Sequence, residues 1–224
     1  MKIEILYVII YVFYFCGLLL ITEYLHKKWI KNPEITRKLA HVTSTLSCIL
    51  FPLLFKQHWW VLILGIIFTL LLYIAKKRKL FSSIENVGRI TIGSVLLPVS
   101  IYLIFLISVQ LRDFLLFIIP LLILGISDPL AGLAAILPGT SRKKVRLGNL
   151  ELNKTYLGSI LFFSSSFAIG LLVFLVNDFR FQYAFIYAFA IAAISSLAEV
   201  LSGRGLDNLT IPVSIEILLV LFII

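Results

Sequence analysis

Apolar runs of roughly membrane-spanning length recur along the whole of this sequence. A transmembrane helix needs about 20 predominantly apolar residues, and eight runs approach that length. They cover residues 3–21, 39–55, 59–75, 91–109, 114–137, 157–176, 183–201 and 209–224. With 61% hydrophobic and only 14% charged residues, the composition lies outside the range of soluble globular proteins. We therefore predict an all-α fold, a polytopic integral membrane helical bundle of seven to eight transmembrane helices.

The number of spans stays open, because the run at 39–55 carries many hydroxyl groups and the last run is short; six or seven spans are the alternatives. The first run begins with Lys2 and Glu4 and has no small-residue cleavage site, so we expect a permanent helix rather than a removed signal peptide. Both cysteines lie in apolar runs and give no basis for a disulfide. Repeats and linkers are absent from the sequence, which predicts a single domain over residues 1–224.

The basic residues alternate with the apolar runs. Of the 20 lysines and arginines, sixteen follow the first, third, fifth or seventh run, and four lie on the opposite side. By the positive-inside rule, this asymmetry predicts a multi-pass membrane protein with its N-terminus outside and the basic loops in the cytoplasm. This topology and the anionic lipids of the bilayer account for the net charge of +9. No recognition motif accompanies the basic residues, so we expect no nucleic acid partner.

The strongest local signal is a carboxylate within the fifth apolar run. Residues 125–132 read Gly-Ile-Ser-Asp-Pro-Leu-Ala-Gly, and an ionisable group inside a span marks a functional site by default. Pro129 frees a backbone carbonyl, while Gly132 and the nearby alanines allow a neighbouring helix to pack closely. Asp128 is suited to bind a divalent cation through hard oxygen ligands. The alternative is that Asp128 caps a new helix after a break in the run.

A second polar stretch opens the second run. By their spacing, four of its polar side chains share one helix face that we expect to point away from lipid: Arg37, His41, Ser44 and Thr45. With Lys38, this stretch would present cationic and hydrogen-bonding groups near the cytoplasmic end of the second run. In the alternative interpretation, Arg37 and Lys38 extend to lipid headgroups and His41 only binds a backbone carbonyl.

Three further clusters lie at the ends of runs on the same side of the membrane. Arg89 closes the third basic loop, and Lys154 immediately precedes the sixth run. Glu199 lies near the end of the seventh run, with Asp207 and Asn208 in the turn that follows. The plainer alternatives are a re-entry turn at Arg89, an ordinary positive-inside residue at Lys154 and interfacial exposure of Glu199. Asp207 and Asn208 are also common in turns for conformational reasons alone.

All five clusters fall at the membrane face that the basic residues assign to the cytoplasm. Cationic side chains and buried acids on one shared face predict a place where Mg²⁺ and a polyphosphate meet a lipid. The sequence contains neither a Walker A pattern nor a kinase glycine loop, which fits a nucleotide site built from helix ends.

The order of these motifs resembles the polyprenol kinase family, which includes dolichol, phytol and farnesol kinases and CTP-dependent diacylglycerol kinases. The resemblance covers roughly residues 35–213. The motifs that carry it are Arg37-Lys38 with His41, Ser127-Asp128 with its alanines, Asn-Lys-Thr-Tyr-Leu-Gly-Ser at 153–159, and Glu199 with Leu-Asp-Asn-Leu-Thr-Ile-Pro at 206–212. The last string is the most specific. The sequence departs from the family pattern at Ser127, where a glycine is usual, and at Ala135-Ile136, where a glycine-arginine pair is usual.

The resemblance implies a transmembrane lipid-alcohol kinase-like domain. In the family, the arginine-lysine pair and the aspartate are associated with nucleotide use, so those roles pass to Arg37, Lys38 and Asp128. The residues expected to bind the nucleotide are Arg37, Lys38, Arg89, Lys154 and Asn208. The residues expected to bind Mg²⁺ are Asp128, Glu199 and Asp207. The expected catalytic residues are Asp128, Lys154, Glu199 and His41, and the general base is either His41 or one of the acids.

We therefore expect transfer of the γ-phosphate of CTP to the hydroxyl of a membrane lipid alcohol, of the polyprenol or dolichol, phytol or diacylglycerol type, with Mg²⁺ at the cytoplasmic face. Two alternatives stay open. A phosphatidate cytidylyltransferase-like enzyme also shows a Ser-Asp segment and a lysine-threonine motif, but it would make a CDP-lipid. A membrane transporter would spread polar groups along a pathway through the bilayer. The sequence decides neither the acceptor, nor CTP against ATP, nor the oligomeric state.

Overall fold

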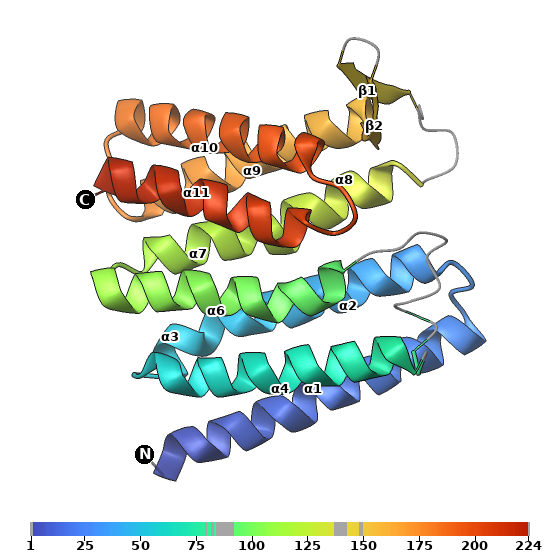
Figure 1. Ribbon diagram of the computed structural model, residues 1–224. Helices are drawn as coiled ribbons and strands as arrows, with labels where there is room; N and C mark the ends of the chain where they lie inside the picture. Colours follow the sequence, from blue (N-terminus) through green and yellow to red (C-terminus); the bar gives the residue numbers. More distant parts are fainter. Residues whose placement is uncertain are drawn as a thin grey trace.

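The computed structural model describes residues 2–78, 80–81, 83, 92–136, 143–147 and 150–223. Its helices run back and forth along a common direction and form an elongated bundle (Figure 1). The helices are α1 (Lys2–Lys28), α2 (Pro33–Ser47), α3 (Phe51–Leu54), α4 (His58–Lys77), α6 (Gly93–Leu111), α7 (Leu115–Leu122), α8 (Asp128–Ala134), α9 (Tyr156–Val176), α10 (Phe181–Leu201) and α11 (Asp207–Ile223). A 3-10 turn, η1 (Cys48–Leu50), joins α2 to α3, and a π-helical segment, η2 (Ile123–Ser127), joins α7 to α8.

Six helical segments in the described part of the chain are long and apolar enough to cross a membrane. They are α1, α4, α6, the continuous segment Leu115–Ala134, α9 and α10, in agreement with the predicted helical membrane bundle. The other two apolar runs are helical but shorter. The run at 39–55 becomes most of α2, η1 and α3, and the run at 209–224 lies in the 17-residue α11. Seven to eight spans therefore stay a prediction.

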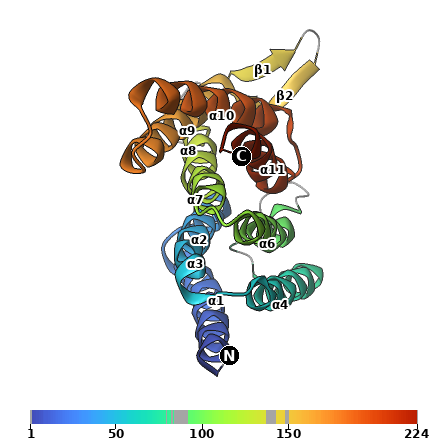
Figure 2. The same cartoon turned by 90° about the vertical axis from the view of Figure 1, so that its left-hand side faces the viewer.

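The segment Leu115–Ala134 is the central helix of the bundle. Within an apolar stretch of 18 residues in this segment, 78% of the residues are buried by the rest of the protein. The corresponding share is 17 to 33% in the other five candidate spans. Figure 2 shows α7 and α8 between a group formed by α9, α10 and α11 and a group formed by α1, α2, α4 and α6. A polar group on this central helix is therefore surrounded by protein and not by lipid.

Two hydrophobic clusters hold these groups to the central helix. In one, Phe162 of α9, Ile191 of α10 and Ile215 of α11 are fully buried against α7. In the other, Phe51 of α3 and Phe105 of α6 meet at a ring-centroid distance of 6.2 Å within a cluster that also includes α1, α4 and α7. Because α7 belongs to both clusters, it fixes the position of the two groups relative to each other.

A short antiparallel hairpin departs from the predicted all-α fold. Strands β1 (Lys144–Leu147) and β2 (Leu150–Thr155) pair with Leu147 opposite Leu150. The sequence carries an overlooked signal for it, because alternating apolar and charged residues flank Gly148-Asn149, a dipeptide typical of two-residue hairpin turns. The hairpin leads directly into α9, whose first turn Thr155 caps by accepting a hydrogen bond from the N–H of Gly158 at 3.1 Å.

The two ends of the chain lie at the end of the bundle opposite the hairpin (Figure 1). The hairpin end is where α2 and α11 begin and where α8 ends. At the start of α2, the side chain of Asn32 accepts a hydrogen bond from the N–H of Glu34 and Pro33 occupies the first turn, a strong start signal for a helix. Helices α2, α8 and α11, which are far apart in the sequence, thus have one end each at the hairpin end of the bundle.

Candidate functional site

A cavity of about 850 Å³ lies between the two helix groups and extends to the hairpin end of the bundle. Its size is that of a small-molecule or cofactor site. Eight of the nine predicted site residues line it: Arg37, Lys38, His41, Asp128, Lys154, Glu199, Asp207 and Asn208. We call the part of the cavity that these eight residues line the polar end. The ninth predicted residue, Arg89, lies outside the described residues.

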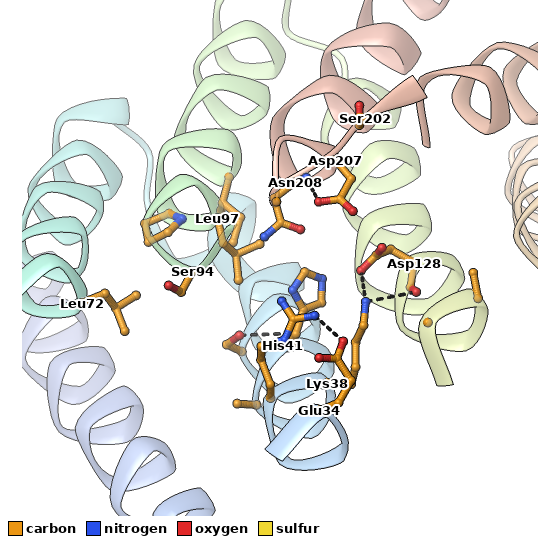
Figure 3. Close-up of a pocket in the computed structure, with 18 of the residues that line it drawn as sticks. Glu34, Lys38, His41, Leu72, Ser94, Leu97, Asp128, Ser202, Asp207 and Asn208 are labelled. Carbon is orange, nitrogen blue, oxygen red and sulfur yellow. Dashed lines mark hydrogen bonds and ion pairs between the residues drawn. The ribbon is translucent and has the colours of Figure 1, made fainter. Parts of the chain in front are cut away.

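The first feature of the polar end is an ion pair between α2 and α8. Lys38 Nζ lies 2.6 Å from Asp128 Oδ2 and also donates to the backbone carbonyl of Asp128 at 3.2 Å (Figure 3). The two side chains are only 8% and 5% exposed. Lys38 therefore reaches into the protein and not to lipid headgroups. The capping alternative for Asp128 is wrong as well, because the helix is continuous from Leu115 to Ala134.

Gly132 allows α2 and α8 to come this close. A β-carbon at residue 132 would lie 2.6 Å from Cε and 2.9 Å from Nζ of Lys38, well inside van der Waals contact. The small residues after Asp128 thus make room for two neighbours: Gly132 for the Lys38 side chain of α2, and Ala131 for α9, where a β-carbon at Gly158 would lie 3.0 Å from the Ala131 carbonyl oxygen.

The π-helical segment before Asp128 explains the position of His41. In this segment the N–H of Asp128 bonds to the carbonyl of Ile123, five residues back. The next bond in the same register would join residue 129 to Leu124, but Pro129 has no N–H. The Leu124 carbonyl instead accepts a hydrogen bond from Nε2 of His41 at 2.9 Å. Nε2 therefore carries the hydrogen of this bond, and Nδ1 is the nitrogen that can accept a proton in the neutral ring.

The second feature of the polar end is a lysine between two acids. Nζ of Lys154, on β2, lies 2.7 Å from Oε1 of Glu199 on α10 and 2.9 Å from Oδ2 of Asp207 on α11. Glu199 is 3% exposed, so the alternative of interfacial exposure is wrong. Burial lowers the pKa of Lys154, but the carboxylates of Asp207, Glu199 and Asp128 outweigh burial and raise this pKa above its usual range. Lys154 is therefore a cation held between Glu199 and Asp207.

Two buried polar atoms at the cavity have no hydrogen-bond partner in the part of the chain that the structure describes. Oε2 of Glu199 and Nε of Arg37 are buried without a hydrogen-bond partner among the described residues. Arg37 forms an ion pair with Glu34, one turn earlier on α2. Glu34 also lines the cavity. It was not among the predicted site residues, although its i, i+3 spacing from Arg37 is a signal for such a pair. A buried acceptor and a buried donor thus remain free to bind a ligand in the cavity.

Asn208 has a structural role in this arrangement. Its side-chain amide donates to the carbonyl of Gly93 at 2.7 Å, and its own carbonyl accepts a hydrogen bond from the hydroxyl of Ser100. These bonds fasten the start of α11 to α6. Asn208 lines the cavity as predicted, but its amide group is already engaged by the backbone.

The acids fit a magnesium ion that binds together with a substrate phosphate. In the described part of the chain, no group of three or more His, Cys, Asp or Glu side chains could hold a metal ion by itself. Mg²⁺, however, is usually bound by one or two carboxylates plus phosphate oxygens and water. The buried and unpartnered Oε2 of Glu199 is a hard oxygen ligand of this kind. Asp128, Glu199 and Asp207 therefore suit a metal ion that arrives with a nucleotide.

Comparison with known proteins yields one curated relative. A phytol kinase from Synechocystis sp. is 27% identical over 202 residues, which cover 89% of this chain and 84% of that protein. No protein-family model matches the chain, and no solved structure matches it. The similarity therefore extends over most of the length of both proteins. It supports the assignment of this chain to the polyprenol and phytol kinase family that the order of its motifs resembles.

Proposed function

We propose that this protein is a CTP-dependent kinase that transfers a phosphate to the hydroxyl of a membrane lipid alcohol, with Mg²⁺ and at the cytoplasmic face. One observation carries the proposal: two lysines, Lys38 and Lys154, each paired with a buried acid, lie in a single cavity whose remaining lining is largely apolar. Phosphoryl transfer depends mainly on positioning and on neutralising charge. A transporter would spread such groups along a pathway, whereas these gather at one end of the bundle.

The lysine pairs suggest how a nucleotide is bound. Lys38 and Lys154 are held by Asp128, Glu199 and Asp207. When a triphosphate enters, each lysine can exchange a carboxylate oxygen for a phosphate oxygen, because both are anionic acceptors. Arg37 adds a further cation at the mouth of the cavity. Mg²⁺, held by Asp128 with Glu199 or Asp207, would neutralise charge on the phosphates.

The transfer step also requires removal of one proton. The oxygen of the lipid alcohol forms a bond to the γ-phosphorus, the bond from that phosphorus to the β-phosphate oxygen breaks, and CDP leaves. The alcohol proton passes to a base, either Nδ1 of His41 or one of the acids. His41 is held in place for this role by the bond between its Nε2 and the Leu124 carbonyl.

The positions of the basic residues support a cytoplasmic site. Lys27 and Lys28 end α1, and Lys76 and Lys77 end α4, where cations also offset the negative end of the helix dipole. Both helix ends lie at the hairpin end of the bundle (Figure 1). The positive-inside rule places this end, and with it the polar end of the cavity, in the cytoplasm.

The decisive test is an assay of the purified protein in lipid nanodiscs. It is incubated with labelled CTP or ATP, Mg²⁺ and a panel of lipid alcohols: farnesol, phytol, dolichol and diacylglycerol. A kinase releases CDP and forms a phosphorylated alcohol, and the Asp128→Asn variant serves as the inactive control. Release of pyrophosphate with formation of a CDP-lipid would instead identify a cytidylyltransferase. No turnover with any pair of substrates would overturn the proposal.

A further inference from the structure

The cavity does not end at the polar end but continues between α1, α2, α4 and α6. This second part has an almost entirely hydrocarbon lining, in which the main side chains are Leu19, Cys48, Val61, Leu64, Phe68 and Ile101. We call it the apolar arm. Leu72 of α4 and Leu97 of α6 lie across the cavity from Asp128 and continue its wall toward the polar end (Figure 3).

The apolar arm runs along the helices into the bilayer. On α4, Leu72 and Val61 both line the cavity and are separated by 11 residues. At a rise of 1.5 Å per residue, this separation is about 16 Å. The hydrocarbon core of a bilayer is about 30 Å thick. The apolar arm therefore reaches about as deep as the tails of one lipid leaflet.

The lining of the apolar arm is interior surface and not lipid-facing surface. Val61 and Leu64 are each only 2% exposed, whereas Ile63 and Ile66 on the same helix are 41% and 50% exposed. Protein interiors are normally packed without large voids, because an unfilled apolar volume loses dispersion contacts. A cavity that is lined by hydrocarbon is suited to an apolar guest.

Aromatic rings close the deep end of the apolar arm. Phe51, the deepest cavity residue of the α2 to α3 segment, packs edge-on against Phe55 at a centroid distance of 5.4 Å. Phe105 meets Phe117 in the same way, also at 5.4 Å. Phe55, Phe105 and Phe117 do not line the cavity and are no more than 1% exposed. They form a packed floor below Phe51 and Val61.

We propose that the apolar arm binds the hydrocarbon chain of the lipid alcohol, and that its closed end limits the length of chain that the enzyme accepts. The hydroxyl group then lies at the polar end, beside Lys38 and Asp128. A single arm of leaflet depth fits one chain of the farnesol or phytol type. It does not accommodate the two chains of a diacylglycerol or the full length of a dolichol. This inference rests on the proposed kinase function.

The test measures chain-length preference in variants that fill the apolar arm. The activities of Val61→Trp and of the control Ile66→Trp, which places the same ring on the lipid-facing side of α4, are compared with geraniol, farnesol and phytol. We expect Val61→Trp to lose at least about tenfold in kcat/KM with phytol and to keep its activity with geraniol, because only the longer chain meets the ring. Ile66→Trp should match the unmodified protein with all three alcohols. Equal loss with all three alcohols in Val61→Trp, or no loss, would overturn the inference.

A second variant covers the case in which Val61→Trp does not fold. Val61→Ala enlarges the deep end, and we expect the preference to move from farnesol toward phytol or longer alcohols. An unchanged preference in Val61→Ala would also count against the apolar arm as a length limit.

Photo-crosslinking separates failure of this inference from failure of the proposed function. A long-chain alcohol with a diazirine at its far end is bound without nucleotide, and the labelled peptides are identified by mass spectrometry. Labelling of α3 and the first half of α4 that is suppressed by unlabelled phytol supports the inference, even if no phosphate is transferred. Labels confined to lipid-facing residues such as Ile63, or labels that only phospholipid displaces, would overturn it even if the protein is a kinase.

Discussion

Lys38 Nζ binds Asp128 twice, at 2.6 Å through the carboxylate and at 3.2 Å through the backbone carbonyl, across 90 residues of sequence. Both side chains are almost fully buried. The pair fastens α2 to the central helix and places a cation and an anion at the same point of the cavity. Removing one partner therefore has two separate consequences, one for stability and one for activity.

We expect Lys38→Met to destabilise the protein by about 3–5 kcal/mol, because it leaves the Asp128 charge buried without its partner. The double variant Lys38→Met, Asp128→Leu should recover most of this loss, since no buried charge remains. Both variants, like Asp128→Asn, should lose activity by about a hundredfold or more. Unfolding followed by tryptophan fluorescence and the kinase assay measure the two effects. Substantial activity in the double variant would exclude a catalytic role for the pair.

Gly132→Ala is expected to lower activity with little change in stability. The new methyl group would displace the end of the Lys38 side chain, which is flexible and can move without moving the backbone. We expect about a tenfold loss in kcat/KM, less than the roughly hundredfold effect of losing one charge-stabilising group, because Lys38 is displaced and not removed. Gly17→Ala in α1 is the matched control, because nothing lies within 4 Å of the added carbon. Equal activities of the two variants would show that the position of Lys38 is not critical.

Lys154→Met should abolish activity and lower stability, because Glu199 and Asp207 would repel each other without the cation between them. A loss of about 3–5 kcal/mol is typical when a buried ion pair is broken. Lys144→Met is the control on the same hairpin. Lys144 pairs with Glu151 at 2.8 Å but is 48% exposed, so its loss should change the free energy of unfolding by less than about 1 kcal/mol. Thermal unfolding of the two variants checks this difference.

The buried acid Glu216 on α11 yields a prediction about stability alone. It is 3% exposed, and neither carboxylate oxygen has a hydrogen-bond partner among the described residues. Glu216 does not line the cavity. Since burying an unsatisfied polar group is unfavourable, Glu216→Met should raise the free energy of unfolding by about 1–3 kcal/mol and leave kcat/KM unchanged. A drop in either quantity would contradict the prediction and indicate an unrecognised role for this acid.

The arrangement of the acids predicts that metal binding requires the nucleotide. Without three acidic or imidazole ligands in one place in the described part of the chain, the protein alone should bind Mg²⁺ only weakly, because phosphate oxygens have to complete the coordination. Equilibrium dialysis with Mn²⁺ as a probe should therefore detect binding only when a non-hydrolysable CTP analogue is present. Stoichiometric Mn²⁺ bound without the nucleotide would contradict this.

Much of the site could be predicted from local sequence. Asp128 and Glu199 are acids within apolar runs, and Arg37, His41 and Ser44 share one helix face and do line one cavity. These patterns are visible because helix periodicity and membrane burial act over a few residues. The hairpin that carries Lys154 was missed, since a weak turn signal of two residues was outweighed by the apolar runs on either side.

By itself, the sequence determined that the chain is a helical bundle with membrane-spanning helices and which polar groups gather at one end of it. Only the tertiary structure decided their partners. Lys154 meets Asp207 across 53 residues of sequence, and the apolar arm exists because α1, α2, α4 and α6 leave a space between them. Such contacts depend on how whole helices pack, and the helices pack around a central segment whose burial no local pattern encodes. Packing therefore decided which of these groups form ion pairs and where the apolar arm lies.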